Sequence, residues 1–375
     1  MPAFKRKIFY LSGFDPRGAR FYQQLYTEQA ALFGATAGRR IEVGERRREP
    51  PHSAAWKIRD VDADTEVDYV FLGWDDVVRA HWVKNPLGLL GRSIKAYANF
   101  TRLVDWSIVH KFPWGVKIAF YYPGISTILF PILFGLLLAV PLVAALGWAW
   151  GLLAAAVAGI AIALWVVKRI QGFWLLRFII FNDILASERL PADVDDRMVT
   201  FAETIRASFA EDWDEILFVT HSNGSILAVP IMARLIEGCD GTLPDRFSLV
   251  TLGSSIPLIG ARRDSHRFRA LLDRVGAGDF RWLDINSITD GACIAGIDPC
   301  IGGPQRRADL FQTSPRWFKY CDPATYQARR RNKYETHFDY LRTFDRLSPL
   351  DYIAISSGAR PLAESIAAFK ADNDV

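Results

Sequence analysis

The sequence predicts an α/β fold with a mostly parallel sheet flanked by helices, interrupted by a two-helix transmembrane hairpin. Two observations predict it. Short apolar strands alternate with helix-like segments near both ends of the chain, which is typical of a parallel sheet covered on both faces. Between these parts, the 50 residues from 118 to 167 include no Asp, Glu, Lys, Arg or His.

The composition excludes several classes of protein. Half of the 375 residues are hydrophobic and 23% are charged, which excludes a mainly disordered chain. A net charge of +4 is too small to indicate a nucleic-acid-binding protein. The four cysteines form no CxxC pair, which argues against a zinc finger and a disulfide scaffold. We expect no metal and no cofactor.

The uncharged run is long enough for two membrane crossings. A helix needs about 20 apolar residues to cross a bilayer, and Pro, Gly and Trp cluster around residues 141–151, so we expect spans over 124–145 and 149–167. Positive flanks favour the cytoplasm, and both ends of the run are basic: Lys111, Lys117, Lys168, Arg169 and Arg177. We therefore expect an integral protein of the plasma (inner) membrane with its remainder on the cytoplasmic side. The alternative is a pair of buried helices in a soluble core.

Two further features of this region concern packing. In the second span small residues recur every four positions: Gly147, Gly151, Ala155, Gly159 and Ala163. Such a stripe lets helices approach closely, so it either packs the two spans together or joins two chains in a homo-oligomer. The flanking segments 84–116 and 170–181 mix apolar and basic residues. They either lie in the headgroup plane as amphipathic helices or pack on a core.

Outside the hairpin the chain alternates between strand and helix. Strands are expected at 8–11, 40–47, 55–62, 68–73, 215–220, 247–252 and 280–285. Helices are expected near 18–33, 196–210, 224–238 and 265–275. No repeat or low-complexity linker separates the parts. We therefore divide the chain into 1–117, the hairpin 118–167, and 168–375, with the two outer parts forming one α/β domain.

A serine follows directly on a buried strand within residues 216–228, and a helix begins at once. A sharp turn there would lift the Ser222 hydroxyl above the end of the sheet, and Gly224 would let strand and helix approach closely. The Asn223 N–H lies at the helix start, where it can donate to an oxyanion. The alternative is an ordinary serine N-cap. We expect the neighbouring His221 to be structural.

Candidates for an acid and a base lie later in the chain, and the family resemblance described in the next paragraph implies their roles. Asp290 follows the strand at 280–285, where its carboxylate can orient a histidine; Asp284 and Asp298 are the alternatives. Of the six histidines, only His337 lies in the C-terminal part beyond this acid. His337 is therefore the candidate for the general base that the family resemblance described next implies.

These motifs resemble those of the α/β-hydrolase superfamily, in particular its lipase- and esterase-like serine hydrolases. The segment T-H-S-N-G at 220–224 resembles the nucleophile elbow G-x-S-x-G, with Thr220 in place of the first glycine. The resemblance implies a catalytic triad of Ser222, Asp290 and His337 in the family's chain order.

The resemblance also implies an oxyanion hole and a reaction. The hole would use the N–H of Asn223 and one from the loop after the first strand, for which Phe14 is our choice and Gly13 or Asp15 the alternatives. The implied function is a membrane-anchored serine hydrolase that cleaves an acyl ester of a lipid or other amphiphile. The alternatives are an acyltransferase or thioesterase with the same triad, and a non-catalytic hydrolase-fold scaffold.

Overall fold

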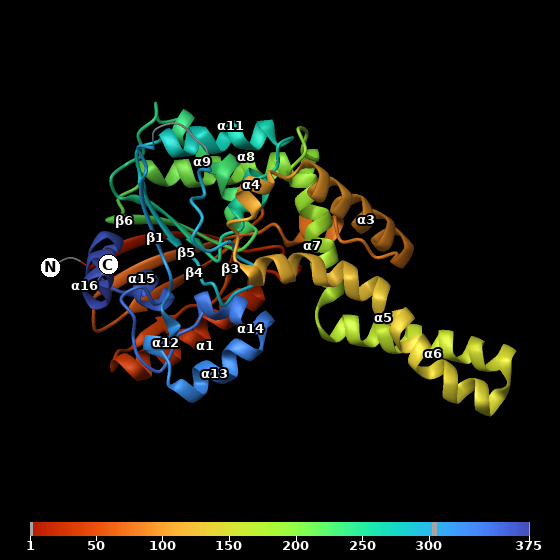
Figure 1. Cartoon of the computed structure of the whole chain (residues 1–375). Helices are drawn as coiled ribbons and strands as arrows, with labels where there is room; N and C mark the ends of the chain where they lie inside the picture. The colour runs from red at the N-terminus through yellow and green to blue at the C-terminus, as the bar shows by residue number, and fades with distance from the viewer. Residues whose placement is uncertain (1–2, 302–305, 375) are drawn as a thin grey trace. The chain divides into compact units, whose positions relative to one another are not determined.

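The computed structural model describes residues 3–301 and 306–374, which divide into two compact units (Figure 1). The α/β unit comprises Met1–His81, Asp105–Pro113 and Ala186–Val375, and the helical unit comprises Trp82–Val104 and Trp114–Leu185. The boundaries suggested by the sequence follow the uncharged run alone. The helical unit is defined by packing and also takes in the segments on either side of that run.

A nine-stranded sheet forms the centre of the α/β unit, in the order β2-β4-β5-β1-β6-β7-β8-β9, with β3 paired to β4. The strands that run parallel to one another are β1 (Phe4–Leu11), β5 (Thr65–Leu72), β6 (Glu215–His221), β7 (Phe247–Leu252), β8 (Arg281–Ile285) and β9 (Asp309–Thr313). The antiparallel strands are β2 (Ile41–Val43), β3 (Arg47–Glu49) and β4 (Ser53–Asp60). The mostly parallel sheet predicted from the sequence is confirmed.

The burial of the strands explains why the sheet has this order. Every residue of β6 is buried, and so are the last six of β1. A strand covered on both faces reads as a continuous apolar run, and these two lie side by side in the middle of the sheet. The second half of β4 alternates between buried and exposed residues, as expected where one face meets water.

Helices cover both faces of the sheet (Figure 1). On one face lie α8 (Ala192–Ala207), α9 (Gly224–Glu237) and α11 (His266–Ala277). On the other lie α1 (Ala19–Ala37), α15 (Tyr352–Ser357) and α16 (Leu362–Asn373). The shorter helices are α2 (Asp75–Ala80), α4 (Trp106–Val109), α10 (Ile256–Gly260), α12 (Trp317–Tyr320), α13 (Pro323–Arg331) and α14 (Lys333–Phe338), with 3-10 turns η1 (Ser208–Ala210) and η2 (Asp339–Leu341).

A buried ion pair fastens the end of the chain to the sheet. Arg6 on β1 donates from Nε to Glu215 on β6 at 2.6 Å and from its terminal nitrogens to the carbonyls of Gly358 and Arg360. The second oxygen of Glu215 accepts from the N–H of Leu362 at 2.7 Å. A buried charge destabilises a fold unless it is paired and hydrogen-bonded, and each of these charges is.

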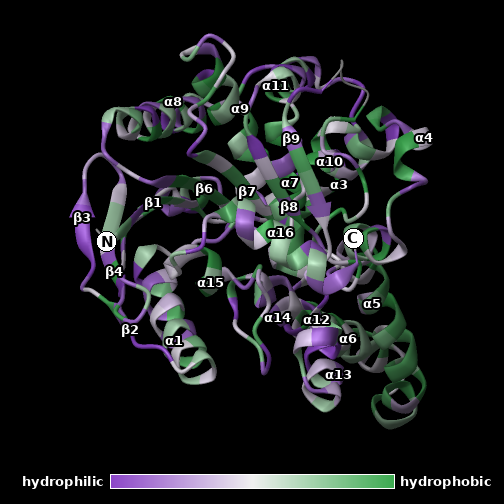
Figure 2. Cartoon of the chain, turned by 90° about the vertical axis from the view of Figure 1, so that its left-hand side faces the viewer, coloured by the Kyte–Doolittle hydropathy of each residue, from purple (hydrophilic) through white to green (hydrophobic). Residues whose placement is uncertain are grey.

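The helical unit consists of α3 (Pro86–Leu103), α5 (Trp114–Leu146), α6 (Trp148–Arg169) and α7 (Gly172–Leu185). By length and composition α5 and α6 are able to cross a membrane, and both are strongly hydrophobic along their length (Figure 2). They are separated at Gly147, whose φ of +77° suits glycine. Two helices were expected here, although α5 begins ten residues before the expected start at 124.

The small-residue stripe of α6 faces α5. A Cβ on Gly159 would lie 2.5 Å from the Gly135 nitrogen, and one on Gly151 would overlap Val143. The glycines therefore let the two backbones approach to a distance that no larger residue allows. A homo-oligomer built on the same stripe would have to displace α5.

The segments that flank the hairpin pack on each other within the helical unit, α3 against α7. Asn99 on α3 donates to Asp183 on α7 at 2.9 Å, and Arg177 on α7 donates to the Val83 carbonyl at 2.9 Å. Asp183 is the one acidic residue of this unit.

Candidate active site

Ser222 occupies the sharp turn between β6 and α9. Its φ of +55° lies in the left-handed region, which is strained for a residue with a side chain. Its N–H donates to the Leu252 carbonyl at 2.9 Å, and its own carbonyl accepts from the N–H and Oγ of Ser225 at 2.9 and 2.6 Å. Hydrogen bonds on both sides of the turn thus hold the strained backbone. The arrangement strand, serine, helix is the one that the sequence predicts.

Two glycines let this turn approach the end of β1. A Cβ on Gly13 would lie 2.8 Å from the Ser222 Cβ, and one on Gly224 would lie 2.5 Å from the Leu11 carbonyl oxygen. Neither site has space for a side chain. The loop after β1, which carries the buried Phe14, therefore passes directly beside the serine.

His337 and Asp290 form a buried pair in the same unit. His337 Nδ1 lies 2.8 Å from Asp290 Oδ2, and Oδ1 of the same carboxylate accepts from the Ala292 N–H at 2.9 Å. Burial alone would raise the pKa of Asp290, but the facing imidazole and the N–H outweigh it and hold that pKa below its ordinary value. An ionised carboxylate only accepts, so Nδ1 donates to it; in the neutral form of the ring, Nε2 is then the acceptor.

The other nitrogen of the His337 ring, Nε2, is buried and has no hydrogen-bond partner among residues 3–301 and 306–374. It therefore makes no hydrogen bond to the Ser222 hydroxyl in this structure. Catalytic hydrogen bonds are often long in unliganded enzymes and tighten in the substrate complex. An unpartnered acceptor in a buried site is what a general base requires before substrate arrives.

His221 links the serine turn to the histidine. Its Nε2 lies 2.7 Å from the backbone carbonyl oxygen of His337, and the two ring centroids are 4.8 Å apart. Burial, reinforced by the neighbouring imidazole, lowers the pKa of His221 to about 3, so the ring is neutral and donates through Nε2. The residue adjacent to Ser222 thus holds the backbone of His337.

The loop that carries Asp290 is fixed by two residues that sequence reasoning missed. The hydroxyl of Tyr340 accepts from the Ser287 N–H at 2.9 Å and lies 3.3 Å from the sulfur of Cys293. That sulfur also contacts the Ser287 carbonyl. Burial raises the pKa of Cys293 well above its ordinary value, so this thiol is protonated and structural. Within the described ranges no group of three or more His, Cys, Asp or Glu is arranged to hold a metal ion.

The two alternative acids lie elsewhere. Asp284 on β8 is buried and accepts hydrogen bonds from three side chains: Thr251 (2.5 Å), Asn286 (2.7 Å) and Gln312 (2.9 Å). Burial raises its pKa despite these donors. Asp298 pairs with Arg306 at 2.5 Å near the surface. Only Asp290 of the three bonds to His337 in the part of the chain that the structure describes.

Of the residues expected to bind an oxyanion, Asn223 directly follows the serine and Phe14 lies in the loop that passes beside it. Asn223 is the N-cap of α9, a position whose N–H has no intrahelical acceptor. Its side-chain amide is fully buried, and neither of its polar atoms has a partner among the described residues. The carboxylate of Asp15, beyond Phe14, is occupied by Arg17 (2.6 Å) and the hydroxyl of Tyr22 (2.9 Å).

The parallel strands bring these groups to one edge of the sheet. Ser222 follows β6, Asp290 follows β8 and His337 comes after β9, and the carboxyl ends of parallel strands meet at the same edge. No family model, no curated protein and no solved structure matches this chain.

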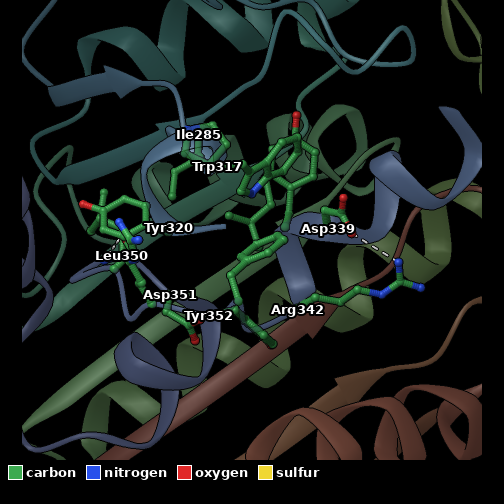
Figure 3. Close-up of a pocket in the computed structure, with 14 residues that line it drawn as sticks. Ile285, Trp317, Tyr320, Asp339, Arg342, Leu350, Asp351 and Tyr352 are labelled. Carbon is green, nitrogen blue, oxygen red and sulfur yellow. Dashed lines mark hydrogen bonds and ion pairs between the residues drawn. The ribbon is translucent and has the colours of Figure 1, made fainter. Parts of the chain in front are cut away.

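A small cavity lies next to the site, bounded by Leu252 and Tyr340 among others. Figure 3 shows Trp317 and Tyr352 in its wall and Asp339 paired with Arg342 at one side. Its volume of about 30 Å³ accommodates one or two waters. The cavity is therefore too small for an acyl chain.

Proposed function

We propose that the protein is a membrane-anchored serine hydrolase of the α/β-hydrolase type that cleaves an acyl ester of a lipid or another amphiphile. The observation that carries this proposal is the strained serine turn at the sheet edge where His337 is paired with Asp290. The order Ser222, Asp290, His337 along the chain is the order of the α/β-hydrolase triad.

In the proposed acylation step, the Ser222 Oγ attacks the ester carbonyl carbon while His337 Nε2 accepts the hydroxyl proton. Asp290 keeps the proton on Nδ1 and stabilises the imidazolium that forms. The carbonyl oxygen becomes an oxyanion, to which the N–H groups of Asn223 and Phe14 donate. The tetrahedral intermediate then collapses, and the leaving alcohol takes the proton from Nε2.

The acyl-enzyme is resolved by the reverse sequence with water as the nucleophile. His337 Nε2 removes a proton from the water as it attacks the acyl carbon, and the same proton returns to the Ser222 Oγ as the serine ester breaks. The product is a free carboxylic acid. His221 supports both steps because it holds the His337 backbone at 2.7 Å.

The substrate class follows from the hairpin. Two helices able to cross a bilayer would keep the catalytic residues of the same chain near the membrane surface, where lipids and other amphiphiles are concentrated. The basic residues that flank the hairpin favour the cytoplasmic side for the catalytic residues.

A fluorophosphonate probe tests the proposal, because it labels only an activated serine. We expect membranes containing the wild type to be labelled and Ser222→Ala to be unlabelled. Ser208→Ala is the matched control, since Ser208 is also buried but lies in η1, and it should label like the wild type. A folded wild-type protein that remains unlabelled would overturn the proposal and favour a scaffold. Labelling without release of free acid from a lipid ester would indicate acyl transfer instead.

A further inference from the structure

Helix α3 presents an apolar face to solvent beside the hairpin. Its buried side chains recur at helical spacing and form the packed face: Leu89, Ser93, Ala96 and Phe100. Leu87, Leu90 and Ile94 are three and four positions apart, so they form one stripe on a different face. They are 80%, 37% and 54% exposed. A contiguous exposed apolar patch is typical of a surface that binds a partner or a membrane.

Exposed cationic side chains lie just before α3 and on other parts of its exposed surface. Lys84, Arg92 and Lys95 are all exposed, and none of them has an ion pair or a side-chain hydrogen bond to any residue that the structure describes. Between residues 77 and 182, Asp105 is the only acidic residue. Lys84, Arg92 and Lys95 are thus not neutralised by any residue that the structure describes.

The charge is a property of the helical unit as a whole. That unit contains eight Lys and Arg against one Asp, whereas the rest of the chain contains 37 Lys and Arg against 40 Asp and Glu. A modest net charge of +4 therefore conceals a strongly cationic unit attached to a slightly anionic one. The cationic unit is the one that contains the two hydrophobic helices.

We propose that the exposed surface of α3, with the apolar stripe Leu87, Leu90 and Ile94 and the exposed cations Lys84, Arg92 and Lys95 before and around it, docks on the surface of an anionic lipid bilayer. The interfacial region satisfies both halves of the face, because the acyl boundary accepts the apolar stripe and the phosphates accept the cations. Continuity with the hairpin in one compact unit brings α3 to that surface. The inference rests on the membrane anchoring in the proposed function and is independent of the hydrolase chemistry.

The test places an environment-sensitive fluorophore on α3 in the full-length chain. Cys239→Ser and Cys300→Ser remove the partly exposed thiols, since Cys293 and Cys321 are buried. NBD on Leu90→Cys is read in phosphatidylcholine nanodiscs with and without phosphatidylglycerol. We expect a blue-shifted, iodide-protected emission when the anionic lipid is present. NBD on Leu32→Cys, an exposed leucine on α1 of the α/β unit, should respond to neither lipid.

A charge variant completes the test. Replacing the three cations together (Lys84→Gln, Arg92→Gln and Lys95→Gln) should lower the preference for anionic lipid by roughly 100-fold, at about fivefold for each basic residue. An Leu90 probe that stays water-exposed in both lipids would overturn the proposal, as would a lipid preference that survives the triple variant. Protection in detergent that grows with protein concentration would identify a second copy as the occupant. Fluorophosphonate labelling of the same samples reports separately on the hydrolase proposal.

Discussion

The α/β unit and the helical unit place their apolar side chains in opposite ways. In the α/β unit the central strands are sealed, with Ile8, Leu217 and Phe218 fully buried. In the helical unit large apolar side chains point outward, and Leu136, Leu137 and Val140 are 68%, 64% and 78% exposed. A water-soluble fold hides such residues beneath covering helices, while a helix surrounded by lipid has no reason to.

The same contrast appears in what holds each unit together. The sheet is packed by large interdigitating side chains such as Trp56 stacked on Tyr69. In the hairpin the helix backbones themselves are in close contact, because neither Gly159 nor Gly135 has a side chain where the two meet. Hydrophobic burial drives association only in water, so helices in lipid depend instead on close backbone contact. The packing of the helical unit is therefore of the kind that the proposed membrane anchoring requires.

The largest expected effect is on ester hydrolysis alone, with membrane anchoring unchanged. Asp290→Asn should lower kcat/KM for a soluble short-chain ester by about 10⁴-fold, because the wrong His337 tautomer would face the serine. Extraction of the protein from membranes by carbonate should be unchanged, since Asp290 lies in the α/β unit. The pH-stat rate of ester hydrolysis measures the activity, and immunoblotting of the carbonate extract measures how much protein leaves the membrane.

Asp298→Asn is the control for this variant, because Asp298 pairs with Arg306 near the surface. It should retain nearly full activity. If Asp298→Asn or Asp284→Asn costs as much activity as Asp290→Asn while remaining folded, the assignment of the acid is wrong.

A smaller effect is expected in the hairpin. Gly159→Ala puts a methyl group 2.5 Å from the Gly135 nitrogen, so it should destabilise the α5–α6 pair by about 1–3 kcal/mol. Disulfide trapping of a cysteine pair across α5 and α6 measures the loss of contact. Gly135→Ala is the control, because its Cβ would meet only the Ala155 carbonyl oxygen at an ordinary 3.8 Å. Equal trapping in the two variants would mean that the glycines do not set the helix spacing.

The smallest effect concerns acid stability of the α/β unit. An unfolded histidine takes up its proton near pH 6.5, whereas burial and the nearby imidazole lower the pKa of folded His221 to about 3. Between these values the unfolded state binds more protons, so stability falls as the pH is lowered. In wild type this residue lowers the free energy of unfolding by up to about 1.4 kcal/mol for each pH unit of acidification, and His221→Gln should remove that contribution.

Asp351, in the same unit, is expected to make stability depend on pH in the opposite direction. Burial raises its pKa to about 7, above the value near 4 of an unfolded carboxyl, so its contribution to stability falls as the pH rises between them. Urea unfolding across about pH 4.5 to 6.5 should therefore show the slope against pH reduced in His221→Gln and increased in Asp351→Asn. Equal slopes in the two variants would contradict both assignments.

Sequence patterns predicted what is local. The parallel strands, a break within residues 141–151 (found at Gly147) and the serine between β6 and α9 are each specified by a few neighbouring residues. The short strand β9 was missed because its residues DLFQT mix polar and apolar types without strict alternation. The antiparallel pairing of β2, β3 and β4 also depends on contacts that no local pattern reveals.

The candidate site divides in the same way. The position of Ser222 follows from its own segment, while Asp290 and His337 were chosen by chain order and are brought together by the fold. His221 and His337 are 116 residues apart in the sequence, so no pattern near His221 predicts their contact. Tyr340 shows only one local signal, its place three residues after His337.

The position of the helical unit within the chain also sets an order of assembly. Strand β1 pairs with β5 on one side and with β6 on the other, and the whole helical unit is encoded between β5 and β6. A ribosome needs on the order of 10 s to synthesise that stretch. Throughout this interval β1 is an open edge, and the serine turn does not yet exist. Under the proposed function, the hairpin is synthesised before Ser222, so a nascent chain would become catalytically competent only after its hairpin has left the ribosome.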